Sequence, residues 1–169
     1  GIERCTLEVH GRGNRLVMMS DFLHILPEVQ EALKSGQAVV ALESTIVAHG
    51  MPYPQNLETA QRLESIVRAG GAVPATVAVI NGKLQVGCTI EDLTALATSP
   101  DVLKVSRRDL PLALARKKLG ATTVSGTLIG CELAGIRVFA TGGIGGVQRG
   151  VERTWDISAD IPELAKASV

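Results

Sequence analysis

VPATVAVI, residues 73–80, is a continuous run of β-branched and small apolar residues, and such a run predicts a buried strand. Asn81 and Gly82 follow it and form a strong hairpin signal, so residues 83–86 are expected to return as an antiparallel partner. Two further apolar runs, at 38–42 and 136–140, are typical of short strands buried in a parallel sheet. These strands define the expected sheet.

Helical patterns lie between the strands. The expected helices are residues 27–34, a segment capped by Asn56 and running to Val67, a segment from a Thr89–Asp92 capping box to Ala97, residues 109–119, and a small-residue helix that ends near Gly135. Residues 102–105 and 122–124 are expected to be short strands. Because strands alternate with helices, we predict an α/β fold whose mixed sheet is covered by helices on both faces.

Composition sets the class of protein. The chain has 169 residues, 46% of them hydrophobic, which suits a folded domain and excludes general disorder. Seventeen basic residues balance seventeen acidic ones, which argues against a nucleic-acid partner. No apolar run is long enough to cross a bilayer, so no membrane partner is expected. Cys5, Cys88 and Cys131 have no metal-type spacing and are expected to be reduced thiols of a cytoplasmic protein.

The first residues differ from the rest. Residues 1–18 mix Gly, Arg and His without a clear period, and are expected to be a non-native or disordered leader. Met19 opens a stretch with regular helix signals, so residues 19–169 are expected to form part of one domain.

Ligands of such sheets bind where the carboxyl ends of the strands open into loops. Glu43 directly follows the strand at 38–42, where a partly desolvated carboxyl group suits a proton donor. The alternative is a strand-end Glu that pairs with a neighbouring group. His49, in the following loop, is expected to be polar surface.

A basic cluster and a glycine run mark two more strand ends. Lys104, Arg107 and Arg108 could hold a phosphate, or could form a solvated surface paired with Asp109. The run TGGIGGVQRG, 141–150, fits neither GxGxxG nor a Walker loop. It favours a sugar-phosphate cradle with Arg149 nearby, or else a tight structural turn.

The segment DISAD, 156–160, carries two carboxylates four residues apart. Oxygen ligands at this spacing suit Mg²⁺ or Mn²⁺, with waters completing the coordination shell. The alternative is that Asp160 caps a helix that starts near Ile161.

Six segments in this order resemble the pseudouridine-5′-phosphate glycosidase family, to which indigoidine-synthase-A-like proteins belong. The segments are VVALESTIVAHGMPYPQN (39–56), GGAVPATVAVINGKLQVG (70–87), KVSRRDLP (104–111), GATTVSGT (120–127), FATGGIGGVQRG (139–150) and DISAD (156–160). The resemblance runs from residue 19 to residue 169, and its specificity comes from the number and order of the motifs.

The resemblance implies a lyase of the pseudouridylate synthase type, which reversibly cleaves the C–C glycosidic bond of pseudouridine 5′-phosphate to uracil and ribose 5-phosphate. It further implies Mn²⁺ or another divalent metal, a homotrimer, and a three-layer α/β/α fold with a mixed, mostly parallel central sheet, truncated here. The family's site residues match Glu43 as proton donor, Asp156 as metal ligand, and, as substrate contacts, Lys104, Val124, Ser158, Ala159 and Asp160.

Two departures from the family pattern matter. Gln148 stands where the family has a His, which alters one expected contact, although Gln can still donate a hydrogen bond. The family's Schiff-base Lys lies in a later AGxKSILD-type motif, beyond residue 169, and Lys166 does not match it. Two alternatives therefore stay open: a catalytically inactive fragment that binds sugar phosphate and metal, and a C-glycosyl synthase that uses another aromatic acceptor.

Overall fold

Strand β3 (Val73–Ile80) is the centre of the sheet in the computed structural model, which describes residues 21–169. The expected leader, residues 1–18, lies outside the described residues. The other strands are β1 (Leu23–Ile25), β2 (Val39–Leu42), β4 (Lys83–Val86), β5 (Leu103–Val105), β6 (Gly120–Thr122) and β7 (Val138–Ala140). Their order is β1-β4-β3-β2-β7, and β6 joins β3 to β5.

The sheet is mixed and mostly parallel, as expected. Strand β3 runs antiparallel to β4 through the Asn81–Gly82 turn and antiparallel to β6. The pairs β1–β4, β2–β3, β2–β7 and β5–β6 are parallel. Strands β2 and β7 therefore run in one direction and β5 and β6 in the opposite one, and all four carry residues of the chain's chemical motifs at or just beyond their carboxyl ends.

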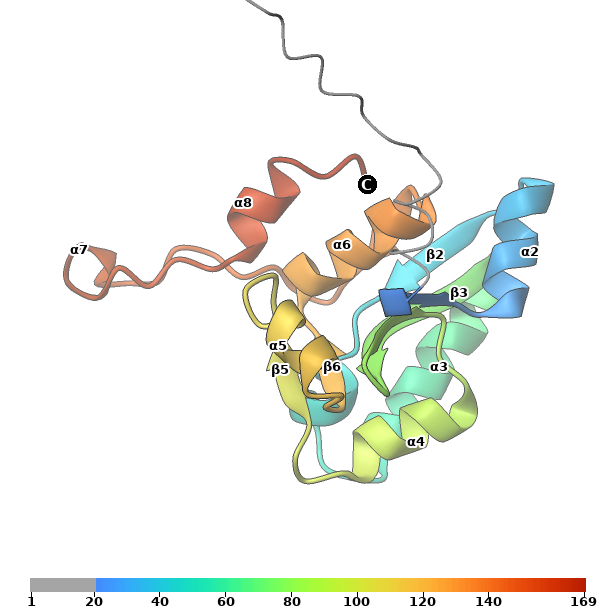
Figure 1. The fold of residues 1–169 in the computed structure, drawn as a ribbon, viewed down its shortest axis with the longest axis horizontal. Coiled ribbons are helices and arrows are strands. Elements are labelled where there is room, and N and C mark those ends of the chain that lie inside the picture. Colours follow the sequence, from blue (N-terminus) through green and yellow to red (C-terminus); the bar gives the residue numbers. More distant parts are fainter. Residues whose placement is uncertain (1–20) are drawn as a thin grey trace, which may run out of the picture.

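The two faces of β3 bury side chains in two separate clusters, which is why all eight of its residues are buried. Val77 and Val79 pack against helices α2 (Pro27–Ser35), α5 (Leu110–Ala115) and α6 (Val124–Ala134). Ala78 and Ile80 pack against α3 (Gln55–Ala69) and α4 (Ile90–Thr98). Figure 1 shows α3 and α4 on one side of the sheet and α2 and α6 on the other. The architecture is three-layer α/β/α.

Local end signals set several helix boundaries. Helix α2 ends at Gly36 and helix α6 at Gly135, both with the left-handed backbone that glycine adopts without strain. Helix α4 begins with the predicted capping box, in which Thr89 and Asp92 satisfy each other's backbone N–H groups. These helices confirm the sequence-based expectations.

Asn56 is not a helix cap. It lies inside the first turn of α3 and is buried, and its side-chain amide donates to the carbonyls of Val47 and Ala97 at 2.7 and 2.9 Å. Val47 belongs to a single π-helical segment, η1 (Ile46–Gly50), in a stretch that was expected to be mostly loop. The amide joins η1 and α4 to α3. This role depends on contacts between segments far apart in sequence, so it could not be predicted from the local pattern.

Two other boundaries and the burial of one strand differ from the sequence-based prediction. Helix α5 ends at Ala115, before Lys117 adopts a positive φ of 50°. Strand β6 ends at Thr122, and Val124 is the first residue of α6. Strand β7 pairs with β2 alone among the described strands, and Val138 is 53% exposed, so its apolar run does not mark a buried strand.

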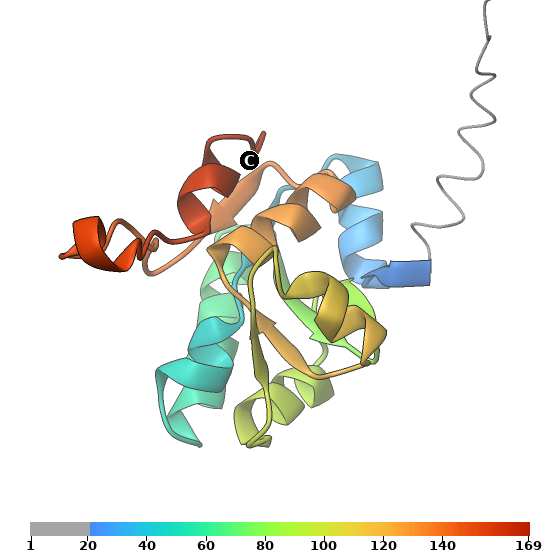
Figure 2. The ribbon, with the colours of Figure 1, turned by 60° about the vertical axis from the view of Figure 1, so that its left-hand side comes forward.

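The segment after β7 leaves the body of the molecule. Figures 1 and 2 show it extending outward to the short helix α7 (Val151–Thr154) and returning to α8 (Asp160–Leu164). One antiparallel bridge, between Val147 and Ile157, joins its two sides. We call residues 141–159 the arm. None of the helices in residues 21–169 combines the length and apolar character required to cross a membrane.

Candidate functional site

A cavity of about 1020 Å³ opens where the carboxyl ends of β2 and β7 face the carboxyl ends of β5 and β6, which run in the opposite direction. It brings together the three places that the sequence selected: the residue after β2, the turn after β5, and the glycine run after β7. All seven expected site residues line it: Glu43, Lys104, Val124, Asp156, Ser158, Ala159 and Asp160. His49 and Arg149 are not among the lining residues.

Glu43 is half-buried at the end of β2. The next residue, Ser44, is fully buried, and its hydroxyl donates to the Val77 carbonyl at 2.6 Å and accepts the Thr122 N–H at 2.8 Å. These bonds tie the end of β2 to β3 and β6, so the backbone at Glu43 is held firmly. The Glu43 carboxylate accepts a hydrogen bond from the Thr141 hydroxyl.

Two cations line the cavity, Lys104 on β5 and Arg108 in the following turn. Both are exposed to solvent, so each can reach a bound anion. Arg107, the third member of the basic cluster, is directed elsewhere: its Nε lies 2.6 Å from the Glu163 carboxylate on α8. Glu163 is buried and raises the pKa of Arg107 through this hydrogen bond. The expected phosphate cluster is therefore reduced to Lys104 and Arg108.

Asp109 shapes the basic turn. Its carboxylate accepts the backbone N–H of Ser106 at 3.0 Å and also the Ser106 hydroxyl. Burial raises the pKa of Asp109, but the hydrogen bonds from Ser106 and the charge of Arg108 outweigh that effect and lower it overall. Asp109 is thus a structural anion that fixes the turn between Lys104 and α5.

Helix α6 points its amino terminus at the cavity. The N–H of Ser125 donates to Asp160 at 2.9 Å, and the N–H of Gly126 donates to the Thr123 side chain at 3.5 Å. Val124, the first residue of the helix, lines the cavity. Because the first N–H groups of a helix have no partner inside it, the Val124 N–H is suited to an anionic ligand.

Gly145 is the point where the arm touches the wall of the cavity. A Cβ at this position would lie 2.2 Å from the Ser158 Oγ, so no other residue fits without displacement. The Gly145 N–H donates to Asp160 at 2.9 Å. The glycine run is therefore a close backbone contact as well as a cavity wall.

Asp156 and Asp160 have different environments. Asp160 is buried, and its two oxygens accept the N–H groups of Ser125 and Gly145. It does not cap α8, which begins without a side-chain cap, so that prediction was wrong. Asp156 is exposed and lines the cavity.

No group of three His, Cys, Asp or Glu side chains in residues 21–169 forms a metal cluster, so the donor set fits only an ion held largely by water and ligand oxygens.

The sequence reasoning missed Thr141 and Trp155. Trp155 lines the cavity from the arm and is 81% exposed. The Thr141 hydroxyl donates a hydrogen bond to the Glu43 carboxylate. Only the parallel pairing of β2 with β7 places the two residues together, and no local sequence pattern predicts that pairing.

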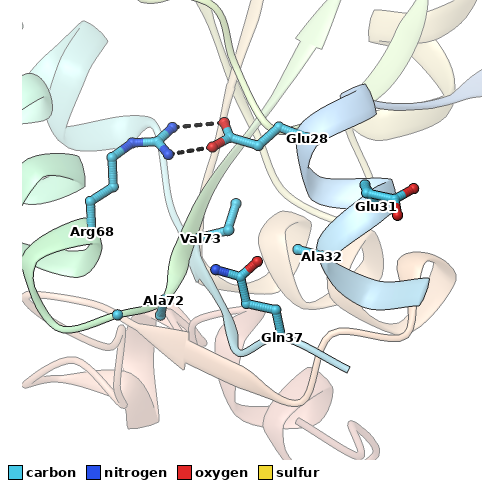
Figure 3. Close-up of a pocket in the computed structure, with 8 residues that line it drawn as sticks. Glu28, Glu31, Ala32, Gln37, Arg68, Ala72 and Val73 are labelled. Atoms are coloured by element: carbon cyan, nitrogen blue, oxygen red, sulfur yellow. Dashed lines mark hydrogen bonds and ion pairs between the residues drawn. The ribbon is translucent and has the colours of Figure 1, made fainter. Parts of the chain in front are cut away.

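A second pocket, of about 400 Å³, lies at the opposite ends of β2 and β3. Figure 3 shows Arg68 reaching across it from α3 to pair with Glu28 on α2 through its two terminal guanidinium nitrogens. The hydrogen bond from Arg68 lowers the pKa of Glu28. Both side chains are about half exposed, so the pair contributes little stability, and the expected site residues lie at the carboxyl end of β2 instead.

A family model described as indigoidine synthase A like protein matches residues 28–169. Two similar proteins are named pseudouridine-5′-phosphate glycosidase. The one from Rhodospirillum centenum is 64% identical over 151 residues, which are 89% of this chain and 47% of the relative. The one from Geobacillus kaustophilus is 60% identical over 151 residues, 89% and 50% of the two chains. The chain thus spans about half the length of the curated relatives it matches.

Two solved structures are similar. The prealnumycin C-glycosynthase AlnA, in complex with ribulose 5-phosphate, matches with a TM-score of 0.76 and 44% identity over 84% of this chain and 46% of that one. An indigoidine synthase A-like protein from Thermotoga maritima matches with a TM-score of 0.74 and 32% identity over 85% and 46%.

Proposed function

The chain belongs to the indigoidine synthase A-like family, and from that premise we propose that it serves the reversible cleavage of pseudouridine 5′-phosphate to uracil and ribose 5-phosphate. The bond that breaks is the C–C glycosidic bond, so the activity is that of a lyase. The observation that carries the proposal is one cavity that brings the Glu43 carboxyl group together with two cations and a helix amino terminus. These groups match the needs of an acid-assisted reaction on a sugar phosphate.

Glu43 is the proposed proton donor. A C–C glycosidic bond offers no leaving heteroatom to protonate, so a workable route first opens the ribose ring. Glu43 would donate its proton to the ring oxygen as the bond from that oxygen to C1 breaks. Ring opening leaves C1 electron-deficient and still bonded to the base, so the amine of a lysine, which the family resemblance assigns to a later motif, can add to C1 with loss of a proton. When the C–C bond then breaks, its electron pair stays with the uracil carbon, which takes up a proton, and C1 remains as a protonated imine that water converts to ribose 5-phosphate. The part proposed for Glu43 is therefore ring opening.

The phosphate group is proposed to bind between Lys104, Arg108 and the first turn of α6. Charge-assisted hydrogen bonds from the two cations supply most of the attraction, and the Val124 N–H adds direction. Ser158, Ala159 and Asp160 are proposed contacts to the sugar. Their place beside Gly145 supports this, because the cavity wall there is backbone and small side chains.

Asp156 is the proposed ligand of Mn²⁺ or another divalent ion. Its exposed carboxylate in the cavity is the kind of single oxygen ligand that such ions accept together with waters and a substrate oxygen. A bound ion would supply positive charge that polarises the oxygens it contacts. We also propose a homotrimeric assembly and a cytoplasmic location, on the basis of the family resemblance.

A second candidate is a C-glycosyl synthase that joins ribose phosphate to another aromatic acceptor. The structural match to a C-glycosynthase in complex with ribulose 5-phosphate favours it. The higher identity to the glycosidases, 64% against 44%, favours the first proposal. A third candidate is an inactive fragment that binds sugar phosphate and metal.

The test combines turnover with binding. A protein that contains this chain together with the later lysine motif, and its Glu43→Gln variant, are incubated with pseudouridine 5′-phosphate and Mn²⁺, uracil is quantified by chromatography, and ribose 5-phosphate binding is measured by calorimetry. Uracil release that Glu43→Gln lowers at least about 100-fold supports the glycosidase. Binding without release supports the inactive fragment. Condensation of ribose 5-phosphate with another aromatic acceptor, but not with uracil, supports the synthase. Absence of both binding and release overturns all three.

A further inference from the structure

We propose that Thr141 is a positioning residue for Glu43, holding its carboxyl group in both protonation states and linking it to the glycine run. This inference deepens the proposed function, because it rests on Glu43 acting as the proton donor. Strands β2 and β7 are parallel, and Leu42 and Ala140 are their last paired residues. Glu43 and Thr141 are the next residue on each strand, so the register places them side by side.

The hydroxyl of Thr141 has more partners than it has protons. It donates to the Glu43 carboxylate, lies 2.9 Å from the Gly143 carbonyl, and accepts the Gly143 N–H at 3.2 Å. A hydroxyl has one proton and two lone pairs, so it can donate fully to Glu43 or to the Gly143 carbonyl at one time. Which of the two it serves depends on whether Glu43 carries a proton.

Thr141 can form a hydrogen bond with Glu43 in both protonation states of the carboxyl group. When Glu43 is ionised, Thr141 donates to the carboxylate. When Glu43 is protonated, the Glu43 O–H donates to the Thr141 oxygen, and the Thr141 proton turns to the Gly143 carbonyl. Thr141 keeps its own proton throughout, and the proton that leaves goes from Glu43 to the substrate. A proton donor passes through both states in each turnover, so a partner that changes from donor to acceptor keeps the carboxyl group oriented.

The link extends to the cavity wall. Gly143 lines the cavity, two residues before Gly145. The protonation state of Glu43 is therefore passed to the backbone of the glycine run through one side chain. The other charged groups that line the same cavity are Lys104, Arg108, Asp109, Asp156 and Asp160. Each acts on Glu43 through space, whereas Thr141 touches it.

The test compares Thr141→Val, which keeps the shape and removes the hydroxyl, with Thr141→Ser, which keeps the hydroxyl. Thr141 is only partly buried, so both variants are expected to fold, and circular dichroism melting checks this. If Thr141→Val lowers the melting temperature, Thr141→Ala replaces it. The first readout needs no activity: the Gly143 amide resonance of the 169-residue protein is recorded by ¹⁵N NMR, with and without Glu43→Gln, at one fixed pH.

Glu43→Gln is expected to move the Gly143 resonance in the wild-type and Thr141→Ser backgrounds, because the hydroxyl redistributes its hydrogen bonds. In Thr141→Val the resonance is expected to stay in place. An equal displacement of the Gly143 resonance in the Thr141→Val background, or none in the wild type, would overturn the proposal. This result is independent of uracil release, so it stands apart from a failure of the proposed function.

The second readout is kinetic. For a chain that releases uracil, Thr141→Val is expected to lower kcat about tenfold while KM for pseudouridine 5′-phosphate stays within about twofold, and Thr141→Ser is expected to keep the wild-type kcat. A rise in KM with kcat unchanged would assign Thr141 to substrate binding instead.

Discussion

Asp160 accepts the backbone N–H of Gly145 at 2.9 Å, and through its other oxygen it accepts the N–H of Ser125 at the same distance. One buried carboxylate thus joins the arm to the head of α6. Two residues four positions apart in one motif, Asp156 and Asp160, therefore have separable roles, one open to the cavity and one built into its wall.

Asp160→Asn is expected to destabilise the fold. An amide in place of the carboxylate turns an NH₂ group toward one of the two backbone donors and leaves that donor without an acceptor. The expected loss is about 1–3 kcal/mol in the free energy of unfolding, measured by urea denaturation. Asp156→Asn, at an exposed position, is the control and is expected to leave the urea midpoint unchanged. Equal midpoints for the two variants would refute the structural role of Asp160.

Asp156→Asn is instead expected to weaken Mn²⁺ binding by at least about tenfold, because it removes the one exposed carboxylate of the motif. The electron paramagnetic resonance signal of unbound Mn²⁺ measures this directly. Asp160→Asn, at a temperature where it stays folded, is expected to retain the metal affinity. Undiminished Mn²⁺ binding in Asp156→Asn would remove Asp156 from the site.

Lys104→Met is expected to raise the Kd for ribose 5-phosphate about tenfold, since a charge-assisted hydrogen bond is lost while the aliphatic bulk remains. Isothermal titration calorimetry gives the constant. Lys83→Met is the matched control: Lys83 is also an exposed strand lysine, but it does not line the cavity. If the two variants bind alike, the phosphate site lies elsewhere.

Glu64→Gln is expected to stabilise the protein at neutral pH. Burial raises the pKa of Glu64, although a hydrogen bond from Thr76 at 2.6 Å and the charge of Arg68 oppose this. The folded state therefore holds this proton more tightly than the unfolded state, so the Glu64 contribution to stability is largest below the unfolded pKa and is lost as pH rises through the folded pKa.

The Glu64→Gln side chain keeps an oxygen that accepts the Thr76 hydrogen bond, and it carries no charge to desolvate. The free energy of unfolding is therefore expected to rise by about 1 kcal/mol or less at pH 7 and to stay unchanged at pH 3. Thermal unfolding at the two pH values measures it. Glu31→Gln, on the exposed face of α2, serves as control. A stability loss at pH 7 would show that the Glu64 charge is favourable in the fold.

Much of the fold followed from local patterns. The apolar run at 73–80 with its Asn-Gly turn, the Thr89–Asp92 capping box and the glycines that end α2 and α6 all lie where the sequence predicted. These signals depend on backbone conformation and on residues a few positions apart, so they are readable along the chain. Asn56 was misread because its bonds run to residues 9 and 41 positions away.

The sequence by itself determined the fold class, the family and the set of residues to examine, because periodicity and motif order are properties of the chain. Tertiary structure alone decided how those residues are used. It placed Thr141 beside Glu43 through the β2–β7 register, turned Arg107 away to Glu163, and buried Asp160 while exposing Asp156. The physical reason is that strand pairing and burial join segments far apart in sequence, and local residue preferences carry no information about which segments meet.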